Sequence, residues 1–543
     1  MSEEIIKIDP VTRLEGHLEI TATAEDGVVT EAYSHGNMFR GIEKILVDRD
    51  PRDAPTITSR ICGVCHAVHR LTSLRAIEDA AGFKFPGRPG TKEIPDGARI
   101  VRNLIQAVTT IYSHAAHLYV LAGPDYSNAV AGTGIDRLDP FTGAGYLEAV
   151  EAQRILHEIL AVLGGKVQHQ VTAVPGGVTL VPDMGTIGAI LDRLAKPVDE
   201  EGLPLLDVIF VDGVPQLTGE DWIHRKAVPD LLAMVEAAAG LGAGDWGVGH
   251  GNFLCAGVYD LGGEEQLIPS GVYVGKTGER IPMDPTLIDE DVTSGRYTDL
   301  SGGYPGETVT EANLIKEAYT WYKAPKYDGM VVETGPLARL VVNDLNPLGL
   351  RADANKSSTL NRLIARAQEI LYLTGYAPDG VVVIPSQVAA WLVELADKLP
   401  ELGPEDLYTP YEIPETPASG IGLWEAPRGA TVHWVTIADG LRKHWNSKMG
   451  MYERKRGKVI KQYQVIAGTT WNGGGRDVEG TPGAFEQSLV GVPYVADPGA
   501  PIGSPASKPG INILRTIRSY DPCLGCSVHL LTPEGKKYTL RAV

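Results

Sequence analysis

The sequence RICGVC at residues 60–65 and the sequence DPCLGC at residues 521–526 decide how this chain must fold. Each contains a C-x-x-C pair, and 457 residues separate Cys65 from Cys523 (523 − 65 − 1). Two thiolates three residues apart can bind one metal centre, because a tight turn aims both sulfurs at one point. A centre shared by the two pairs requires both ends of the chain to meet. We therefore expect one large domain, although the length alone would allow three or four.

The composition is that of an ordinary globular protein. The 543 residues are 43% apolar and 22% charged, with a formal net charge of −19. This acidic balance argues against nucleic-acid binding, which needs clustered positive charge. The sequence contains neither a signal peptide nor a membrane-spanning apolar run. Only five cysteines are present, too few for a disulfide framework in so large a chain.

The hydrophobic pattern predicts a mixed α+β fold that is mainly α. The first thirty residues alternate as short strands, with an Asp26-Gly27 turn typical of a hairpin. Helical spacing of apolar residues follows over much of the chain. We expect a core bundle of long helices with small peripheral β-sheets. The predicted helices cover about residues 65–81, 96–121, 146–163, 226–240, 308–321, 357–374 and 386–399.

Two segments fall outside this pattern. Residues 400–420 contain five prolines and no helical period, which predicts a surface connection. Residues 441–458 carry seven Lys/Arg and one Glu, a local charge of +6. A solvated hairpin tip is the favoured interpretation, and a docking patch for an acidic partner or an anionic lipid is the alternative.

The two cysteine pairs by themselves allow three interpretations. A structural zinc site is the usual default for such pairs, although zinc ribbons separate them by only 15–20 residues. A rubredoxin-like iron site and unrelated buried thiols are the others. The class that competes with an enzyme is thus a structural or electron-transfer protein with a closed tetrathiolate site.

The residues around the cysteines favour another answer, because seven motifs resemble those of [NiFe]-hydrogenase large subunits, in that family's order. The motifs are VTRLEGHLEI (11–20), MFRGIEKIL (38–46), DPRDAPTITSRICGVC (50–65), YKAPKYDGMVVETGPLAR (322–339), EAPRGA (425–430), TTWNGGGRD (469–477) and RSYDPCLGCSVH (518–529). The resemblance implies the nickel-dependent hydrogenase large-subunit fold and reversible heterolytic oxidation of H2, with the uptake direction favoured.

The resemblance also implies a ligand set. Cys62 and Cys523 look like terminal nickel ligands, and Cys65 and Cys526 look like bridges to an iron that carries CO and cyanide. Soft thiolates suit such a redox-active nickel site. Arg428 and the hydroxyl of Thr469 match the family positions that face the diatomic ligands.

Further matches suggest how protons and charge are handled. The sulfur of Cys523 and the guanidine of Arg428 are the two candidate bases. Arg428 is a poor base by intrinsic pKa, so we expect it to act mainly by electrostatic positioning. Glu15 matches a glutamate that relays protons from the terminal cysteine. Asp125 and Asp521 match acidic residues paired with the arginine, and Asp521 also suits a turn before Pro522.

The histidines divide into three groups. His69 matches a histidine that would tune the cluster by hydrogen bonding. The role of His66 is left open. His114 and His117 lie one turn apart, and core hydrogen bonding is favoured over metal binding because no carboxylate partner is apparent. The fifth cysteine, Cys255, is expected to be a small buried apolar residue.

A magnesium site is implied at Glu43, His529 and the carbonyl group of Val465, a donor set that suits a hard cation. In the family, the residue matching His529 becomes the C-terminus after an endopeptidase removes a tail. Here the 14 residues 530–543 would be removed, taking the charge from −19 to −21. The catalytic domain would then be residues 1–529.

The resemblance finally implies partners. No cysteine set remains for iron–sulfur clusters, so an Fe–S small subunit must form an obligate heterodimer with this chain. Nickel-insertion proteins would load the metal. Location in association with a membrane through the partner is favoured, and a cytoplasmic location is the alternative. The Ala-Gly at residues 467–468 and the GGG after TTWN depart from the family pattern, which suggests a looser pocket wall in a divergent subgroup.

Overall fold

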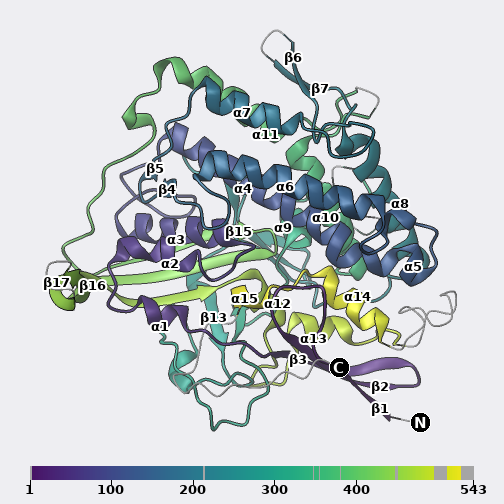
Figure 1. Cartoon of the computed structure of the whole chain (residues 1–543). Helices are drawn as coiled ribbons and strands as arrows, with labels where there is room; N and C mark the ends of the chain where they lie inside the picture. The colour runs from purple at the N-terminus through teal and green to yellow at the C-terminus, as the bar shows by residue number, and fades with distance from the viewer. Residues whose placement is uncertain are drawn as a thin grey trace.

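Two long helices, α4 (Asp96–Ala116) and α6 (Ala144–Gly164), pack against each other in the computed structural model (Figure 1). The structure describes residues 3–211, 214–346, 348–351, 353, 355–378, 381–446, 451–494 and 510–527. Pro95 precedes α4 and Asp96 places a negative charge in its first turn, where the helix dipole favours it. After Ala116 the helix continues as a π-helical turn, His117–Ala122, so the expected helix over residues 96–121 is confirmed in extent.

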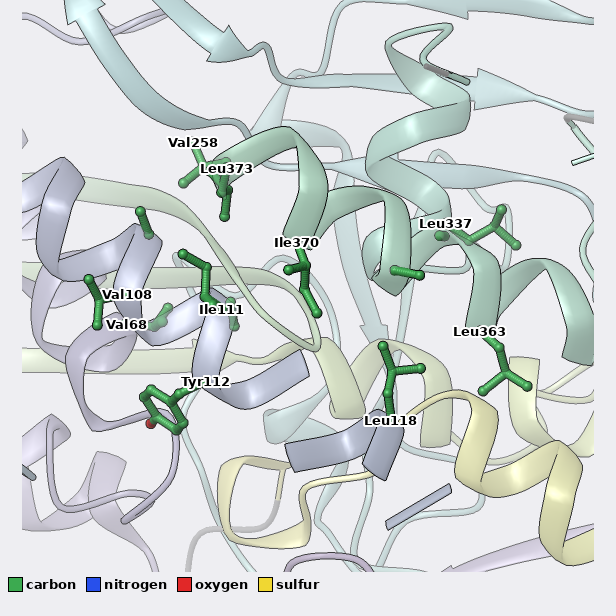
Figure 2. Packing of buried hydrophobic residues seen from close by; sticks show 14 of the residues in the cluster. Val68, Val108, Ile111, Tyr112, Leu118, Val258, Leu337, Leu363, Ile370 and Leu373 are labelled. Atoms are coloured by element: carbon green, nitrogen blue, oxygen red, sulfur yellow. The ribbon is translucent and has the colours of Figure 1, made fainter. Parts of the chain in front are cut away.

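The core forms where α10 (Thr359–Thr374) packs against α4. Figure 2 shows Ile111 and Leu118 with Leu363 and Ile370 in the same apolar region. All four side chains are buried, and each contributes roughly 1.5–3 kcal/mol by leaving water. This shared core fixes α4, whose residue Tyr112 donates a hydrogen bond to the carbonyl oxygen of Val64 in the first cysteine motif.

The remaining helices are mostly short. They are α1 (Ile42–Leu46), α2 (Ala54–Thr58), α3 (His66–Ala80), α5 (Asn128–Ala131), α7 (Met184–Leu194), α8 (Val228–Gly240), α9 (Pro336–Val342), α11 (Gln387–Lys398), α12 (Gly468–Gly473), α13 (Ala484–Leu489), α14 (Ile511–Ser519) and α15 (Leu524–Ser527).

The strands form small antiparallel sheets of two or three strands. They are β1 (Glu3–Ile8), β2 (Leu18–Glu25), β3 (Val28–Gly36), β4 (Ala173–Val174), β5 (Gly177–Val178), β6 (Val208–Val211), β7 (Val214–Leu217), β8 (Phe253–Cys255), β9 (Val258–Gly262), β10 (Glu265–Ile268), β11 (Gly271–Val274), β12 (Glu279–Ile281), β13 (Ile288–Asp291), β14 (Ala324–Tyr327), β15 (Ala418–Ala426), β16 (Gly429–Asn446) and β17 (Met451–Ile466).

The N-terminal sheet has the order β1–β2–β3, as the alternating pattern predicted. Asp26 (φ 49°) and Gly27 (φ 84°) form the turn between β2 and β3. Both residues tolerate positive φ, as a two-residue turn that matches the twist of a hairpin requires.

The sheet β15–β16–β17 is covered by α3 (Figure 1). Gly420 and Gly422 make this packing possible, because a Cβ atom on either would collide with backbone carbonyl oxygens of α3. The expected mixed fold is therefore confirmed, and this sheet is buried where it meets α3 rather than purely peripheral.

The predicted helix at residues 308–321 is wrong. This segment is irregular, and it is held by bridges from Ala312 to Tyr297 and from Thr320 to Gly295. Leu314 and Ile315, which the helical pattern would have placed on a buried stripe, are 65% and 94% exposed. Tertiary backbone pairing has thus overridden a weak periodicity.

The two unusual segments agree with the sequence pattern. Residues 400–420 form a connection with two short 3-10 turns before β15 begins. The basic stretch 441–458 falls on the paired ends of β16 and β17, and its residues 447–450 lie outside the described residues. No helix in the described ranges is long and apolar enough to cross a membrane.

Candidate metal centre

Four cysteine sulfurs from the two ends of the chain converge at one buried point. The Sγ atoms of Cys62, Cys65, Cys523 and Cys526 all lie within 4.8 Å of one another. The Sγ of Cys523 is 3.3 Å from that of Cys62, 3.8 Å from that of Cys65 and 3.0 Å from that of Cys526. The predicted meeting of the two C-x-x-C pairs is confirmed.

The first pair sits in the turn between α2 and α3. The backbone N–H groups of Val64 and Cys65 donate to the Sγ of Cys62 at 3.2 and 3.4 Å, which stabilises negative charge on that sulfur. Cys65 is the N-cap of α3, where the helix dipole has the same effect. The local structure therefore favours thiolates.

The second pair is tied to the N-terminal segment. Cys523 forms a parallel bridge with Glu15, and its N–H donates to the hydroxyl oxygen of Thr469 at 2.9 Å. Cys526 lies on α15, which follows directly. Arg40 joins the two pairs by donating from one nitrogen to the carbonyl oxygens of Ile61 and Gly525.

The electrostatics of the four sulfurs call for a cation. Burial raises the pKa of the Cys523 thiol well above its usual value, and a hydrogen bond with Cys523 lowers the pKa of Cys62. Four buried thiols cannot all ionise without a compensating positive charge. Cys65 and Cys526 have sulfurs in direct contact, but their Cα atoms are 7.7 Å apart, beyond the usual disulfide range. The donor set fits a bound metal centre of soft character.

Glu15 lies where the resemblance implied, beside Cys523. Its Oε2 accepts from the Sγ of Cys523 at 3.3 Å and from the N–H of Gly525 at 2.5 Å. The side chain is half-buried, so it connects the buried sulfur with the outer part of the protein.

Arg428 and Asp521 form a buried ion pair next to the sulfurs. The Nε of Arg428 is 3.0 Å from Oδ2 of Asp521. Burial alone would lower the pKa of Arg428, but the charges of Asp521 and the nearby Cys523 outweigh burial and raise it. The Nη1 of Arg428 is buried and has no hydrogen-bond partner among the described residues, which leaves a donor for a further ligand.

Asp521 also makes the turn that the sequence suggested. Its backbone adopts φ 56°, and its N–H donates to the carbonyl oxygen of Arg518 at 2.9 Å. Asp tolerates this left-handed conformation better than most residues. The turn ends α14 and directs Cys523 toward the other sulfurs.

The expected pairing of Asp125 with Arg428 is wrong. Asp125 instead accepts two hydrogen bonds from Arg518, both at 2.8 Å, and a third from Arg13. Burial would raise the pKa of Asp125, but these arginines outweigh it and lower the pKa. Its carboxylate thus links the segment at Arg13 to α14.

The histidines make buried hydrogen bonds. Nδ1 of His69 lies 3.2 Å from Nε2 of His433, whose Nδ1 lies 2.8 Å from the hydroxyl of Tyr463. Nδ1 of His66 lies 2.8 Å from Oε1 of Gln170. Burial lowers the pKa of His69 to about 3 and that of His66 to about 4, so both rings are neutral.

His114 and His117 hydrogen-bond within the core, as predicted. Nε2 of His117 lies 2.6 Å from the carbonyl oxygen of Arg518. Nε2 of His114 lies 2.6 Å from Oε2 of Glu369, so the expectation that it lacks a carboxylate partner is wrong. Cys255 is fully buried in β8, as predicted.

Glu43 lies next to the backbone of Val465. One oxygen of Glu43 accepts from the N–H of Val465 at 2.9 Å, and the other accepts from the hydroxyl of Thr310. Burial raises the pKa of Glu43, although the charge of Lys323 opposes the shift. His529 lies outside the described residues.

Sequence reasoning missed several residues that support the site. Arg40 and Arg518 hold the cysteine motifs, and Lys323 forms a buried ion pair with Glu290 at 2.6 Å near Glu43. Arg339 contacts the segment before Arg428. All four basic residues lie inside the matching motifs, so the motifs themselves were the available signal.

Comparisons with known proteins agree with the geometry. The family described as nickel-dependent hydrogenase matches residues 40–140 and 141–529, and a HoxL-like family matches residues 5–37. The periplasmic [NiFeSe] hydrogenase large subunit of Desulfomicrobium baculatum is 32% identical, over 97% of this chain and 95% of that protein. The uptake hydrogenase large subunit of Bradyrhizobium diazoefficiens is 30% identical, over 98% of this chain and 96% of that protein.

A solved structure shares the fold along almost the whole chain. The structure of the Ni-Fe-Se hydrogenase from D. vulgaris Hildenborough in the as-isolated oxidised state superposes with a TM-score of 0.76 at 31% identity. The match covers 97% of this chain and 100% of that one.

Proposed function

This chain is a member of the nickel-dependent hydrogenase family, and we propose that it oxidises H2 and passes two electrons to an iron–sulfur small subunit. Its relatives are named hydrogenase large subunits, so it is an oxidoreductase acting on H2 and its partner is a small subunit. One observation carries the proposal: four buried cysteine sulfurs from the two ends of the family match converge within 4.8 Å.

In this proposal Cys62, Cys65, Cys523 and Cys526 would hold a nickel–iron centre whose iron carries CO and cyanide, with Cys62 and Cys523 as terminal nickel ligands and Cys65 and Cys526 as the ligands shared by both metals. The convergence of all four sulfurs on one buried point supports a single shared centre. The centre, when bound, supplies the Lewis-acid site at which H2 splits heterolytically.

The protein residues then handle the proton. The Sγ of Cys523 accepts it, because this sulfur is the one in contact with a carboxylate. Glu15 takes the proton from that thiol across 3.3 Å. The N–H of Gly525 holds the carboxylate in place, and the half-buried position of Glu15 lets it pass the proton outward.

Arg428 acts by position and charge rather than as a base, because its raised pKa keeps it protonated. Its free Nη1 donor faces no described protein acceptor and would serve the diatomic ligands or the reacting gas. Asp521 holds the guanidinium, and Thr469 orients the backbone of Cys523. His69 would adjust the bridging sulfurs from one helical turn beyond Cys65, and Asp125 would brace α14 behind the site.

The electrons need a separate carrier. Among the described residues, the four cysteines are the one cluster of three or more His, Cys, Asp or Glu side chains whose ligand atoms converge, and the fifth cysteine, Cys255, lies apart from them in β8. In this proposal the electrons therefore leave through an Fe–S small subunit that forms an obligate heterodimer with this chain. The uptake direction is supported by the name of the Bradyrhizobium relative. The Desulfomicrobium relative is named a periplasmic hydrogenase large subunit. That name supports a location outside the cytoplasm, which this chain would reach together with its small subunit.

Maturation completes the proposal. Residues 1–529 would form the catalytic unit, with magnesium bound by Glu43, Val465 and His529. Nickel-insertion proteins would load the centre, and an endopeptidase would cut after His529. Mass spectrometry of the active enzyme tests the cut, with loss of residues 530–543 expected and a full-length active chain contradicting it.

The decisive experiment is metal analysis and infrared spectroscopy of the purified two-subunit enzyme. We expect nickel and iron together with bands from CO and cyanide. A Cys523→Ser variant should lose nickel and H2 oxidation, while Cys255→Ser, the matched buried cysteine, should keep both. Zinc alone, or a fully active Cys523→Ser enzyme, would contradict the proposal.

A further inference from the structure

The arginine beside the metal centre sits at the tip of a very short hairpin. Ala426 and Gly429 are paired as the last residues of β15 and the first of β16, so only Pro427 and Arg428 form the loop. Such tips normally face solvent. Here Arg428 is buried, so the carbonyl groups of the tip need partners from the protein.

Arg339 of α9 supplies these partners. Its Nη1 donates to the carbonyl oxygen of Ala426 at 2.9 Å, and its Nη2 donates to that of Pro427 at 3.2 Å. These are the two carbonyl groups immediately before Arg428. The guanidinium of Arg339 thus fixes the backbone from which the guanidinium of Arg428 projects.

Arg339 is itself held rigidly. Its Nε and Nη2 donate to the two oxygens of Glu369, both at 2.6 Å, and its Nη1 donates to Glu425 at 2.6 Å. His114 contacts Glu369 at 2.6 Å, and the N–H of Ala256 donates to Glu425 at 2.6 Å. Every nitrogen of the Arg339 guanidinium therefore donates, in a geometry that only a planar fork can satisfy.

The carbonyl group of Arg428 is also closely packed. A Cβ atom on Gly468 would lie 2.5 Å from the carbonyl oxygen of Arg428, and one on Gly335 would lie 3.4 Å from it. The backbone at Gly468 therefore packs directly against this turn. The hairpin tip is held between these glycines and Arg339.

By contrast, the side chain of Arg428 has few contacts of its own. The Nε of Arg428 forms the ion pair with Asp521. The Nη1 of Arg428 has no hydrogen-bond partner among the described residues. The direction of the guanidinium is therefore set mainly by the backbone from which it projects.

We propose that Arg339 is a positioning residue for H2 conversion, which fixes the Pro427–Arg428 turn so that Arg428 faces the metal centre. The inference rests on the role of Arg428 in the proposed function. Arg339 itself touches none of the metal-binding sulfurs in the described contacts and acts through the turn.

The test uses the complete two-subunit enzyme with Arg339→Lys, which keeps the charge and loses the fork. Arg102→Lys is the matched control, because Arg102 is a buried arginine that binds Glu78 and the carbonyl oxygens of Val174 and Gly177. A misplacement of about 1 Å can cost on the order of 10²-fold in rate. We expect Arg339→Lys to lower kcat by 10-fold to 10²-fold with an unchanged KM for H2 and unchanged nickel content.

Two further readouts separate positioning from general damage. The infrared bands of the metal centre should shift in Arg339→Lys in the same direction as in Arg428→Lys, and should not shift in Arg102→Lys. The double variant of Arg339 and Arg428 should be no slower than Arg428→Lys alone, because both changes remove one function. Multiplicative losses, or an Arg339→Lys enzyme equal to Arg102→Lys, would overturn the inference.

The role of Arg428 in the proposed function fails separately if Arg428→Lys keeps full activity, and the inference falls with it, whereas H2 oxidation at the wild-type enzyme's metal centre is tested by the metal analysis above. If Arg339→Lys does not assemble, Glu425→Gln carries the test, since it weakens one anchor of Arg339 and keeps the volume. We then expect a kcat between those of Arg102→Lys and Arg428→Lys with the same band shift. A Glu425→Gln enzyme with unshifted bands and the kcat of the control would overturn the inference.

Discussion

The glycine at position 525 offers a sharp test of the proton path, because it touches Glu15 without binding metal. A Cβ atom on Gly525 would lie 2.7 Å from both carboxylate oxygens of Glu15. Ordinary contact begins near 3.4 Å, so the carboxylate must retreat by about 0.7 Å. The distance from Oε2 to the Sγ of Cys523 would grow from 3.3 Å to about 4.0 Å, at the limit of a hydrogen bond to sulfur.

The expected loss falls on catalysis more than on stability. Gly525 lies in α15, where alanine gains about 1 kcal/mol over glycine. The weakened hydrogen bond from its N–H to Glu15 costs roughly 1.5–3 kcal/mol. The net destabilisation is thus about 0.5–2 kcal/mol. A positioned proton acceptor contributes on the order of 10²–10⁴ in rate, so a partial displacement in Gly525→Ala should lower kcat by about 10-fold to 10²-fold.

Gly63 is the matched control, since it lies within the other C-x-x-C pair and a Cβ atom there meets nothing within 4 Å. H2-dependent dye reduction and exchange between D2 and solvent protons should both fall in Gly525→Ala and stay near wild type in Gly63→Ala. Nickel content should be the same in both variants. Equal kcat values for the two would refute the assignment of Glu15 as the proton acceptor from Cys523.

The remaining predictions concern assembly and pH. Arg40→Lys should lower nickel retention after mild denaturant, because lysine cannot bridge the two cysteine motifs as the guanidinium does; metal analysis against dialysis time checks this, and unchanged retention would contradict it. Burial raises the pKa of Glu486 to about 7, above its unfolded value of 4.5, so the folded state retains a proton that the unfolded state loses. Stability should therefore fall as pH rises from about 4.5 to about 7, by at most about 1.4 kcal/mol per pH unit from this group. Glu486→Gln should flatten that slope in chemical denaturation series, and an unchanged slope would show that Glu486 does not hold this proton.

The sequence predicted elements well where local patterns were strong. The hairpin at Asp26-Gly27 and the helix beginning near residue 96 are both present, because turn chemistry and a long apolar stripe act locally. The helix expected at residues 308–321 is absent, because the backbone of this segment forms bridges with residues 295 and 297 instead of bonding to itself. Short, weakly periodic segments depend on neighbours that the local sequence does not reveal.

The site shows the same division. The four cysteines and Glu15 could be named from motifs, because each chemical role requires a particular residue type at a fixed spacing. The pairing of Asp125 could not, since several arginines of opposite charge were available and only packing selects Arg518 and Arg13 over Arg428.

By itself, the sequence determined which sulfurs are able to share a metal centre, to which family the chain belongs, and that the two cysteine pairs must meet. Only the tertiary structure decided how the ligands are held in place. Arg40 bridges the two cysteine motifs, and Arg339 fixes the turn that carries Arg428. The reason is physical: thiolate chemistry is a property of single residues at short spacing, whereas the direction of a buried guanidinium depends on carbonyl groups and carboxylates that come together only on folding.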